Sequence, residues 1–490
     1  MRGVASARYR AAARRAAGAA AIVFMLLLAV MLGFMGLALD LAQLYNRRLE
    51  LQGVADAAAI AAAGELTGTS AGVANAVAQA AVAAARLHYQ YQTRQVAWSD
   101  AAIKFSSAPN APDSAWVDAA NAQTAPDGLL YVKVDTSALP SSPGTVATRF
   151  MGALSPSLAS ASTSGHAIAG RSSILVTPLA VCAMSPSPAS ARSNAGQAEL
   201  VEYGFRRGVA YDLMQLNPNA GTPENFLVDP LDPPGTVGTA GSLTPAVAGP
   251  FVCSGNLPIG RLTGGALTVQ RPFPLAQLYQ QLNSRFDQYP GGLCNPNGAP
   301  PDFNIKSYLY NTAIPWMSTV RNGQASDKQT DAARLWTKAD LTPPASNGNT
   351  APVYGPLWSF AKAVPYAAYV AGTPEPAGGY STFATAAWAT LYAPGPPSPI
   401  AYPVNPPYSA AGGANFQAPS PARRPGLRNR RVLNVPLLSC PVAAGANTTA
   451  TVLGVGRFFM TVPATATSVF AEFAGAVPEQ ALGGPVVLYP

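Results

Sequence analysis

Residues 36–63 read GLALDLAQLYNRRLELQGVADAAAIAAA and decide the fold of this chain. The stretch begins inside an apolar run, passes an aspartate and two arginines, and then continues for several turns in alanine. It contains no proline, and the first glycine after the charged residues is Gly53. Proline and glycine are the residues that most often end a helix. The sequence therefore predicts one unbroken helix that leaves the apolar run and continues to Leu66.

The apolar run occupies residues 16–39, reads AAGAAAIVFMLLLAVMLGFMGLAL and contains no charge. About 20 apolar residues suffice to cross the hydrocarbon core of a bilayer, so the run predicts a transmembrane helix. Residues 1–15 form a basic head without acids, which predicts a cytoplasmic N-terminus and an exported remainder under the positive-inside rule. The arginines of this head are Arg2, Arg8, Arg10, Arg14 and Arg15.

A cleaved signal peptide is the competing interpretation of the run. Small residues at Gly36-Leu37-Ala38 would suit a cleavage site. The run is longer than the apolar core of a signal peptide, which has about 7 to 15 residues. This length favours a retained membrane anchor.

The composition of the chain excludes some classes of protein. Of 490 residues 49% are hydrophobic and 11% are charged, with 47 Pro and 44 Gly, whereas soluble domains carry about 25% charged residues. This mix predicts alanine-rich helices, apolar strands and long Pro/Gly loops. The formal net charge is +8, but five of these charges lie in the basic head. We expect no nucleic-acid partner, because a nucleic-acid binder spreads Lys and Arg over a folded face.

Apolar residues recur along the predicted helix at alternating spacings of four and three, which is a heptad-like pattern. Alanine narrows this stripe, and Arg48 interrupts it once. Packing on the chain's own downstream domain and packing on a partner's helix both remain open, because alanine permits close approach in either case. The expected packing positions are Leu37, Leu41, Leu44, Leu51, Ala55 and Ala58.

The sequence predicts an α+β fold in which this helix packs on a small antiparallel sheet within residues 40–172. A second alanine-rich helix is expected from Val73 to about His88. Segments that alternate apolar and polar residues follow and predict strands. These segments are 101–107, 128–137 and 161–170.

Residues 173–490 predict an exported, strand-rich mixed domain. Its clearest helix is PLAQLYQQLNSRFDQY at 274–289, and Pro/Gly-rich connections are expected at 230–250 and 394–427. An apolar strand, SILVTPLAVCAM, opens the domain. Later strand candidates are NFLVDP, ALTVQRPF, VLNVPLLSC, VLGVGRFFMTV and SVFAEFAGAV.

The four cysteines all lie in this second domain, at positions 182, 253, 294 and 440. An exported location favours two structural disulfides. Cys182 and Cys440 each follow a Pro-Leu-x-x-Cys strand ending, which suggests neighbouring strands and leaves Cys253 to pair with Cys294. A bridge between Cys253 and Cys440 would fit the same pattern and stays open.

The N-terminal segment resembles the TadE/TadG-like proteins of bacterial Tad (Flp) pilus assembly. The similarity is carried by Arg15 with Gly18 before the span, by GLALDLAQLY at 36–45 and by LQGVADAAA at 51–59. It implies a minor-pilin or assembly protein of the bacterial inner membrane, anchored by one helix, with the bulk of the chain periplasmic or at the cell surface. Other Tad pilus assembly proteins are the implied partners.

One detail favours the TadG side of the family, and another departs from it. TadE-like proteins carry Glu-Phe after the glycine that prepilin peptidase recognises, whereas AAAIVF follows Gly18 here. TadG-like proteins often contain a metal-binding domain that opens with Asp-x-Ser-x-Ser, but this chain has Ala183-Met184-Ser185-Pro186-Ser187. Alanine offers no oxygen ligand to a hard cation, so we expect no metal and no cofactor.

No motif points to catalysis, and we expect no enzyme. GTSAG at 68–72 matches a nucleophile pattern, but an alanine helix precedes it instead of the required strand. The only histidines are His88 and His166. Paired carboxylates for glycoside cleavage stay open, because several aspartates could converge in space. The aspartates concerned are Asp229, Asp232, Asp287 and Asp302.

One basic cluster lies in the second domain, in PARRPGLRNRRVLNVPLL. It suggests either a solvated loop or contact with an anionic polymer such as cell-wall glycan or lipid headgroups. The favoured function is a membrane-anchored structural component of a Tad pilus, and the alternative is an anchored surface protein that binds, or hydrolyses, a glycan or another ligand. The cluster consists of Arg423, Arg424, Arg428, Arg430 and Arg431.

Overall fold

The computed structural model describes residues 3–66, 70–126, 128–194, 196–219, 222–235, 241–263, 265–311, 313–317, 323–326, 328–330, 335–337, 354–393 and 399–489. The chain divides into two compact units. Unit 1 comprises residues 1–171 and 486–490, and unit 2 comprises residues 172–485. The expected α+β class is confirmed, with a long N-terminal helix, a small sheet and a strand-rich second part.

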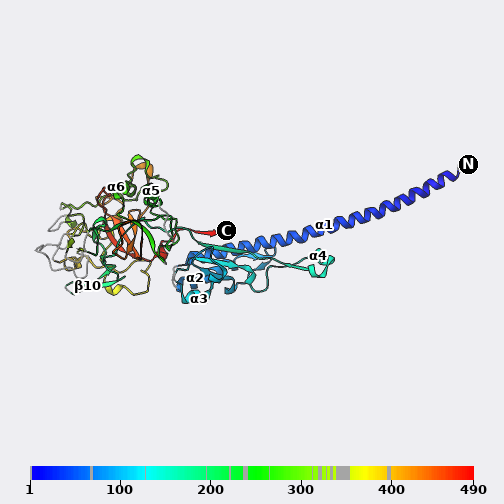
Figure 1. Cartoon of the computed structure of the whole chain (residues 1–490), viewed down its shortest axis with the longest axis horizontal. Helices are drawn as coiled ribbons and strands as arrows, with labels where there is room; N and C mark the ends of the chain where they lie inside the picture. Colours follow the sequence, from blue (N-terminus) through cyan, green and yellow to red (C-terminus); the bar gives the residue numbers. More distant parts are fainter. Residues whose placement is uncertain are drawn as a thin grey trace. The chain divides into compact units, whose positions relative to one another are not determined.

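Helix α1 runs without interruption from Gly3 to Glu65 and is the long blue helix of Figure 1. At 1.5 Å per residue it is about 95 Å long. The expected single helix through residues 36–63 is confirmed. Its C-terminal half belongs to the core of unit 1, where Leu51 and most of the following alanines are buried.

The sheet of unit 1 has five antiparallel strands in the order β22-β8-β5-β3-β4. In β5, Val132 and Val134 are fully buried while the alternate residues are partly exposed, as the period of two predicts. The strands are β3 (Ile103–Ser106), β4 (Val117–Asp118), β5 (Tyr131–Asp135), β8 (His166–Arg171) and β22 (Val486–Tyr489).

Small residues bring the layers of unit 1 close together. Helix α2 (Ser70–Ala85) packs on α1 through alanines of both helices, and the short α3 (Ala119–Thr124) packs on α2. Where β8 begins, a Cβ atom on Gly165 would lie 2.5 Å from the backbone nitrogen of Gln52. Only glycine fits there, because the strand touches the helix backbone.

A β-hairpin extends beside α1 and carries the short helix α4 at its end (Figure 1). We call residues 142–163 the arm. Strands β6 (Thr145–Ala147) and β7 (Ser160–Ser162) pair in antiparallel orientation and enclose α4 (Arg149–Leu154). Unit 1 also contains the small hairpin of β1 (His88–Tyr89) and β2 (Arg94–Gln95).

Unit 2 is built on an eight-stranded mixed sheet in the order β13-β21-β20-β18-β9-β14-β15-β19. Neighbouring strands are antiparallel except β18 and β9, which are parallel. The five later segments expected as strands all form part of this sheet. Its strands are β9 (Leu179–Cys182), β13 (Ala210–Asp212), β14 (Asn225–Val228), β15 (Leu267–Arg271), β18 (Val432–Leu438), β19 (Gly445–Ala450), β20 (Val452–Met460) and β21 (Phe470–Val477).

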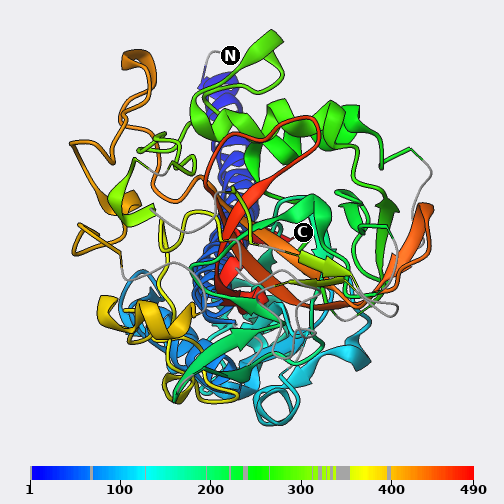
Figure 2. The same cartoon turned by 90° about the vertical axis from the view of Figure 1, so that its left-hand side faces the viewer.

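Both faces of this sheet are covered. In β9, Leu179 and Val181 belong to one hydrophobic cluster, and Ala180 and Cys182 belong to another. Figure 2 shows the orange and red strands within this unit and irregular segments around them. The other elements of unit 2 are α5 (Pro245–Ser254), α6 (Leu275–Leu282), α7 (Trp388–Leu391), β10 (Ser190–Asn194), β11 (Gln197–Glu202), β12 (Phe205–Arg206), β16 (Lys328–Thr330) and β17 (Leu335–Thr337).

Three local expectations are corrected. The helix expected at 274–289 ends at Leu282 and continues as a 3-10 turn to Phe286, after which Asp287 has a positive φ of 65°. The connection expected at 230–250 contains the start of α5, whose cap Thr244 accepts a hydrogen bond from the backbone of Val247. The strand expected at 161–170 is divided between β7 and β8, because the close approach at Gly165 separates them.

The last strand, β22, pairs with β8 of unit 1 although the sequence placed it in the C-terminal domain. Tyr489 also packs edge-on against Tyr131, with ring centroids 5.3 Å apart. Four apolar residues after a glycine-rich stretch carry no signal of the sheet that they join. Unit 2 is therefore inserted between two adjacent strands of unit 1. Its two ends meet, since the Gly484 amide donates to the Ser173 carbonyl at 2.8 Å.

Candidate functional site on the N-terminal helix

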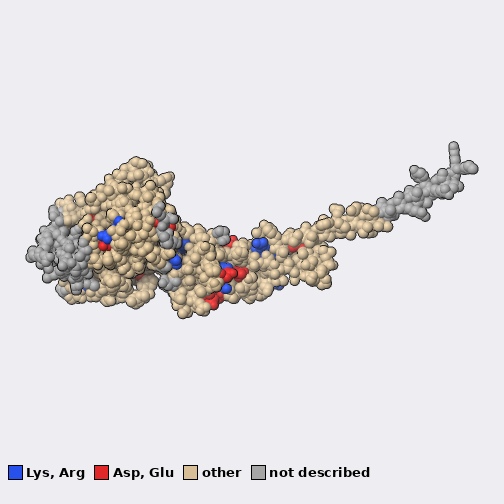
Figure 3. Space-filling model, in the orientation of Figure 1, with Lys and Arg blue, Asp and Glu red and all other residues tan. Residues whose placement is uncertain are grey.

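The first described part of α1, from Ile22 to Leu39, exposes apolar side chains almost continuously. Phe24, Met25 and Phe34 are 66, 72 and 70% exposed. The helix from Ile22 to Glu65 is the one described helix that is long and apolar enough to cross a membrane. Figure 3 shows this segment without charged side chains on the face drawn, next to the grey atoms. Such a surface fits lipid and not water.

The second part of α1 faces protein. Leu51, Ala55 and Ala58 are fully buried within unit 1, and the two alanines belong to its apolar cluster. Leu37 and Leu44 are half-buried. The chain itself does not cover Leu41, which is 51% exposed, so a partner's helix at this position stays a prediction.

Between Gly36 and Arg47 the buried stripe of α1 is shifted by one residue from the expected one. Asp40 is 1% exposed and Arg47 is 9% exposed, whereas the apolar pattern runs through their neighbours Leu41 and Arg48. The reason is that this part of the helix faces the backbone of the arm and not an apolar core. In the sequence, the spacing of seven between Asp40 and Arg47, directly after an apolar run, was the signal that could have indicated these buried positions.

Asp40 caps the helix of the arm. Its carboxylate accepts hydrogen bonds from the backbone amides of Phe150 and Met151 at 2.8 and 2.7 Å. These amides lie in the first turn of α4, where no intrahelical partner exists. The ring of Phe150 also covers Gly36, where a Cβ atom would lie 2.3 Å from it. The carboxylate and the glycine together hold the end of the arm against α1.

Arg47 and Glu50 brace the base of the arm and the β1–β2 hairpin. The Arg47 guanidinium donates to the carbonyl of Pro143 at 2.5 Å and lies 5.0 Å from the ring centre of Tyr89. Glu50 accepts from the backbone amides of Gln90 and Tyr91, at 2.8 Å each. The charged residues after the apolar run therefore serve the folded unit, which explains why the helix does not end there.

The side chains of the basic head lie outside the described residues. Helix α1 includes Arg8, Arg10, Arg14 and Arg15, but their side chains and all of Arg2 lie outside the described residues. Their proposed effect on topology therefore rests on the sequence.

The arginine cluster of unit 2 is mainly structural. The buried Arg431 donates to the carbonyls of Asn304, Lys306, Met460 and Thr461 at 2.6 to 3.0 Å. Arg430 donates to three further carbonyls, and Arg423 pairs with Asp287 at 2.9 Å. Arg424 and Arg428 are exposed. The alternative of contact with an anionic polymer has no support from this arrangement, because the guanidinium groups of Arg430 and Arg431 donate to carbonyls of the fold.

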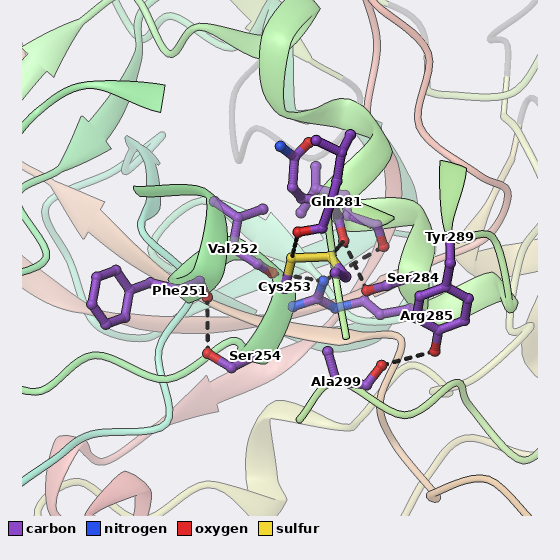
Figure 4. Close-up of a disulfide and its surroundings, with 12 residues drawn as sticks. Phe251, Val252, Cys253, Ser254, Gln281, Ser284, Arg285, Tyr289 and Ala299 are labelled. Carbon is purple, nitrogen blue, oxygen red and sulfur yellow. Dashed lines mark hydrogen bonds between the residues drawn. A yellow bond between two sulfur atoms is a disulfide. The ribbon is translucent and has the colours of Figure 1, made fainter. Parts of the chain in front are cut away.

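Two disulfides cross-link unit 2. Cys182 joins Cys440 with Cα atoms 5.7 Å apart, and Cys253 joins Cys294 at 5.6 Å. The first pair connects the ends of the parallel strands β9 and β18, where Leu438 lies opposite Cys182. The second joins α5 to the segment after α6 and lies beside the buried Arg285, which donates to the Val252 carbonyl at 2.9 Å (Figure 4).

The carboxylates that could have formed a hydrolytic pair are used separately. Asp229 accepts from the amides of Leu231 and Asp232, and Asp302 accepts from Tyr408 and from the Arg431 amide. Burial raises the pKa of Asp302. Glu224 lies beside Cys182 and Cys440, but these sulfurs are joined in a disulfide and provide no thiolates for a metal.

A small cavity of about 200 Å³ in unit 2 is lined by Tyr203, Tyr369 and Tyr380. Aromatic side chains of this kind could stack on a sugar. The carboxylates beside them are already paired, because Arg207 bridges Glu202 and Glu375 at 2.7 and 2.9 Å. The charged groups of this cavity therefore hold the fold together.

The comparisons with known proteins point to the same helix. Residues 18–65 match the family model Tad, described as "Putative Flp pilus-assembly TadE/G-like". No curated protein and no solved structure matches the chain significantly. The matched segment spans the exposed apolar part of α1, Asp40 and the buried alanine-rich part. The expected resemblance is confirmed: residues 18–65 are similar to the TadE/G-like family of Flp pilus assembly.

Proposed function

We propose that the chain is a membrane-anchored structural component of a bacterial Tad/Flp-type pilus and secretion system. The observation that carries this proposal is the change of surface along one unbroken helix. From Ile22 to Leu39 the side chains of α1 are suited to lipid, and from Leu51 onward they form the core of unit 1. Because one helix is both the anchor and part of the core, unit 1 is attached to the membrane span without a flexible linker.

The topology that we propose has the N-terminus in the cytoplasm and both units on the periplasmic side of the inner membrane. Five arginines precede the span, with no acidic residue among the first fifteen residues, and the positive-inside rule then sets the orientation. Two disulfides in unit 2 agree with an oxidising compartment. We assign the chain a structural role and no catalytic one.

The partners that we propose are other pilus assembly subunits, bound through the uncovered face of α1. Leu41, Tyr45 and Leu49 are 51, 65 and 53% exposed. Their spacing of four places them on one ridge of the helix, just beyond the apolar run. This ridge continues the lipid-facing surface and can receive a partner's helix.

A complementation experiment tests the proposed function. Cells that lack this chain should lose Flp-type pili, and the full chain should restore them. A chain in which residues 1–39 are replaced by a cleavable signal peptide should be exported and folded but should not restore piliation. Full restoration by this soluble form would contradict the role of α1 as an anchored spine, and normal piliation without the chain would contradict a role in the pilus.

A further inference from the structure

The end of the arm exposes large apolar side chains that unit 1 leaves largely uncovered. Leu154 is 79% exposed, Phe150 is 48% exposed and Leu158 is 43% exposed. All three belong to α4 and to the turn that follows it. Contiguous exposed apolar side chains at the end of an ordered hairpin mark an interaction surface.

The contacts of the arm fix the level at which this surface lies along α1. Asp40 holds the amides of Phe150 and Met151, and Gly36 lies under the Phe150 ring. Gly36 is three residues before Leu39, the last residue of the apolar run, which is about 4.5 Å along the helix axis. The apolar end of the arm therefore lies beside the end of the membrane span.

The arm also lacks the charges that a water-facing hairpin usually carries. Residues 136–165 contain a single charged side chain, Arg149, although 11% of the whole chain is charged. Arg149 lies at the first position of α4 and is exposed. A long arginine side chain beside apolar residues can reach the phosphates while its neighbours contact acyl chains.

We propose that the end of the arm, residues 149–158, inserts into the headgroup and acyl boundary of the bilayer that α1 spans. The occupant of this apolar surface is lipid, because the surface is continuous with the exposed face of α1 at the level where the span ends. The arm thereby gives the chain a second membrane contact beside the helix. This inference rests on the proposed membrane anchoring, and its test separates the two.

The test uses the full chain in vesicles of phosphatidylcholine and phosphatidylglycerol, with the four native cysteines in their disulfides. An environment-sensitive fluorophore is attached in three separate variants, Leu154→Cys, Phe24→Cys and Tyr91→Cys. Phe24 reports on the span. Tyr91 is 63% exposed and contacts Glu50, which lies ten residues beyond Asp40, or about 15 Å further along α1, so it reports on water above the membrane.

Nitroxide groups on the lipid acyl chains near the headgroups should quench the probe at position 154 at least about fivefold more than the probe at position 91, as interfacial burial requires. Quenching at 24 with no more quenching at 154 than at 91 would overturn the proposal and leave the anchor intact. Absence of quenching at 24, also by nitroxides deep in the acyl chains, would refute both the proposal and the membrane anchor. A blue-shifted probe at 154 that lipid nitroxides do not quench would show that a second copy of the chain covers the arm, and it would overturn the proposal.

Discussion

Unit 1 brings α1 and α2 together through alanines, whereas unit 2 fills its core with large aromatic rings. Ala58, Ala62 and Ala80 are fully buried in unit 1, and in unit 2 the rings of Trp358 and Trp388 lie 4.9 Å apart. Small side chains stabilise unit 1 by allowing backbones to approach. Unit 2 has few long helices, so it depends on side-chain volume and on cross-links.

The two units also differ in how they handle charge. In unit 2 the ion pair of Arg206 and Glu199, 2.8 Å apart, is almost completely buried, and Arg206 donates further bonds to Tyr354 and to the Leu391 carbonyl. In unit 1 the pair of Lys133 and Asp113 leaves its carboxylate exposed, and the more shielded pair of Arg47 and Glu50 is longer, at 3.4 Å. Buried charges require well-placed partners. The stability of unit 2 should therefore depend more on pH and on its disulfides, and the stability of unit 1 more on packing along α1.

The largest expected effect concerns the disulfides, because all four cysteines lie in unit 2. Replacing Cys182 and Cys440 by serine opens a loop with a sequence separation of 258. In the chain-entropy model this lowers the free energy of unfolding by on the order of 5 kcal/mol. The matched Cys253→Ser/Cys294→Ser pair, with a separation of 41, should cost about 4 kcal/mol. Hydrogen exchange should show lost protection in peptides of unit 2 alone. An equal loss of protection in unit 1 would contradict the claim that the disulfides stabilise unit 2 only.

A charge in the core of unit 1 should have the next largest effect. Leu51→Asp places a carboxylate at a fully buried position and should lower the free energy of unfolding of unit 1 by at least about 3 kcal/mol. Gln43→Asp, on an exposed position of the same helix, should cost less than about 0.5 kcal/mol. Denaturant unfolding in detergent measures both. Similar values for the two variants would mean that α1 is not part of the core.

A pH dependence should distinguish unit 2. Glu472 is fully buried and accepts from the amides of Ser359, Phe360 and Ala361, yet burial raises its pKa from 4.5 to about 7. The folded state therefore binds more protons than the unfolded state between these values. The free energy of unfolding of unit 2 should fall by on the order of 3 kcal/mol as pH rises from about 4.5 to 7. Glu472→Gln should lack this slope, and parallel pH profiles for the two proteins would rule out the titration.

The smallest expected effect is local to the arm. Asp40→Ala leaves the amides of Phe150 and Met151 without their acceptor and should cost about 1 kcal/mol. Exchange should quicken in α4 and remain unchanged in α3. The matched control, Asp118→Ala, removes the cap of α3, where Asp118 accepts from the Asn121 amide at 2.9 Å, and should do the reverse. If Asp40→Ala left exchange in α4 unchanged, the carboxylate would not hold the arm.

Sequence patterns that repeat locally predicted much of this molecule. The single helix follows from an apolar run without a helix stop, and the strands β14, β15, β18, β20 and β21 follow from short apolar segments. The disulfide pairs in the structure are the ones suggested by the shared ending before Cys182 and Cys440.

Contacts between distant segments were not predictable in this way. Asp40 meets backbone amides 110 and 111 residues away, and β22 joins β8 across the whole of unit 2. A side chain that bonds to backbone groups of a distant segment produces no periodic pattern in the sequence, because every residue carries such groups. The arginines at 430 and 431 read as a basic patch for the same reason, since their acceptors are carbonyls of other segments.

The most direct test of the account is the intact mass of the chain extracted from membranes. If α1 is both anchor and core, the membrane-bound protein should retain residues 16–39, and its mass should include these residues. The same species should stay in the membrane fraction after alkaline washing. A mature chain that begins near Leu39 and leaves the membrane would contradict the central claim, because the exposed half of α1 would then be a discarded signal.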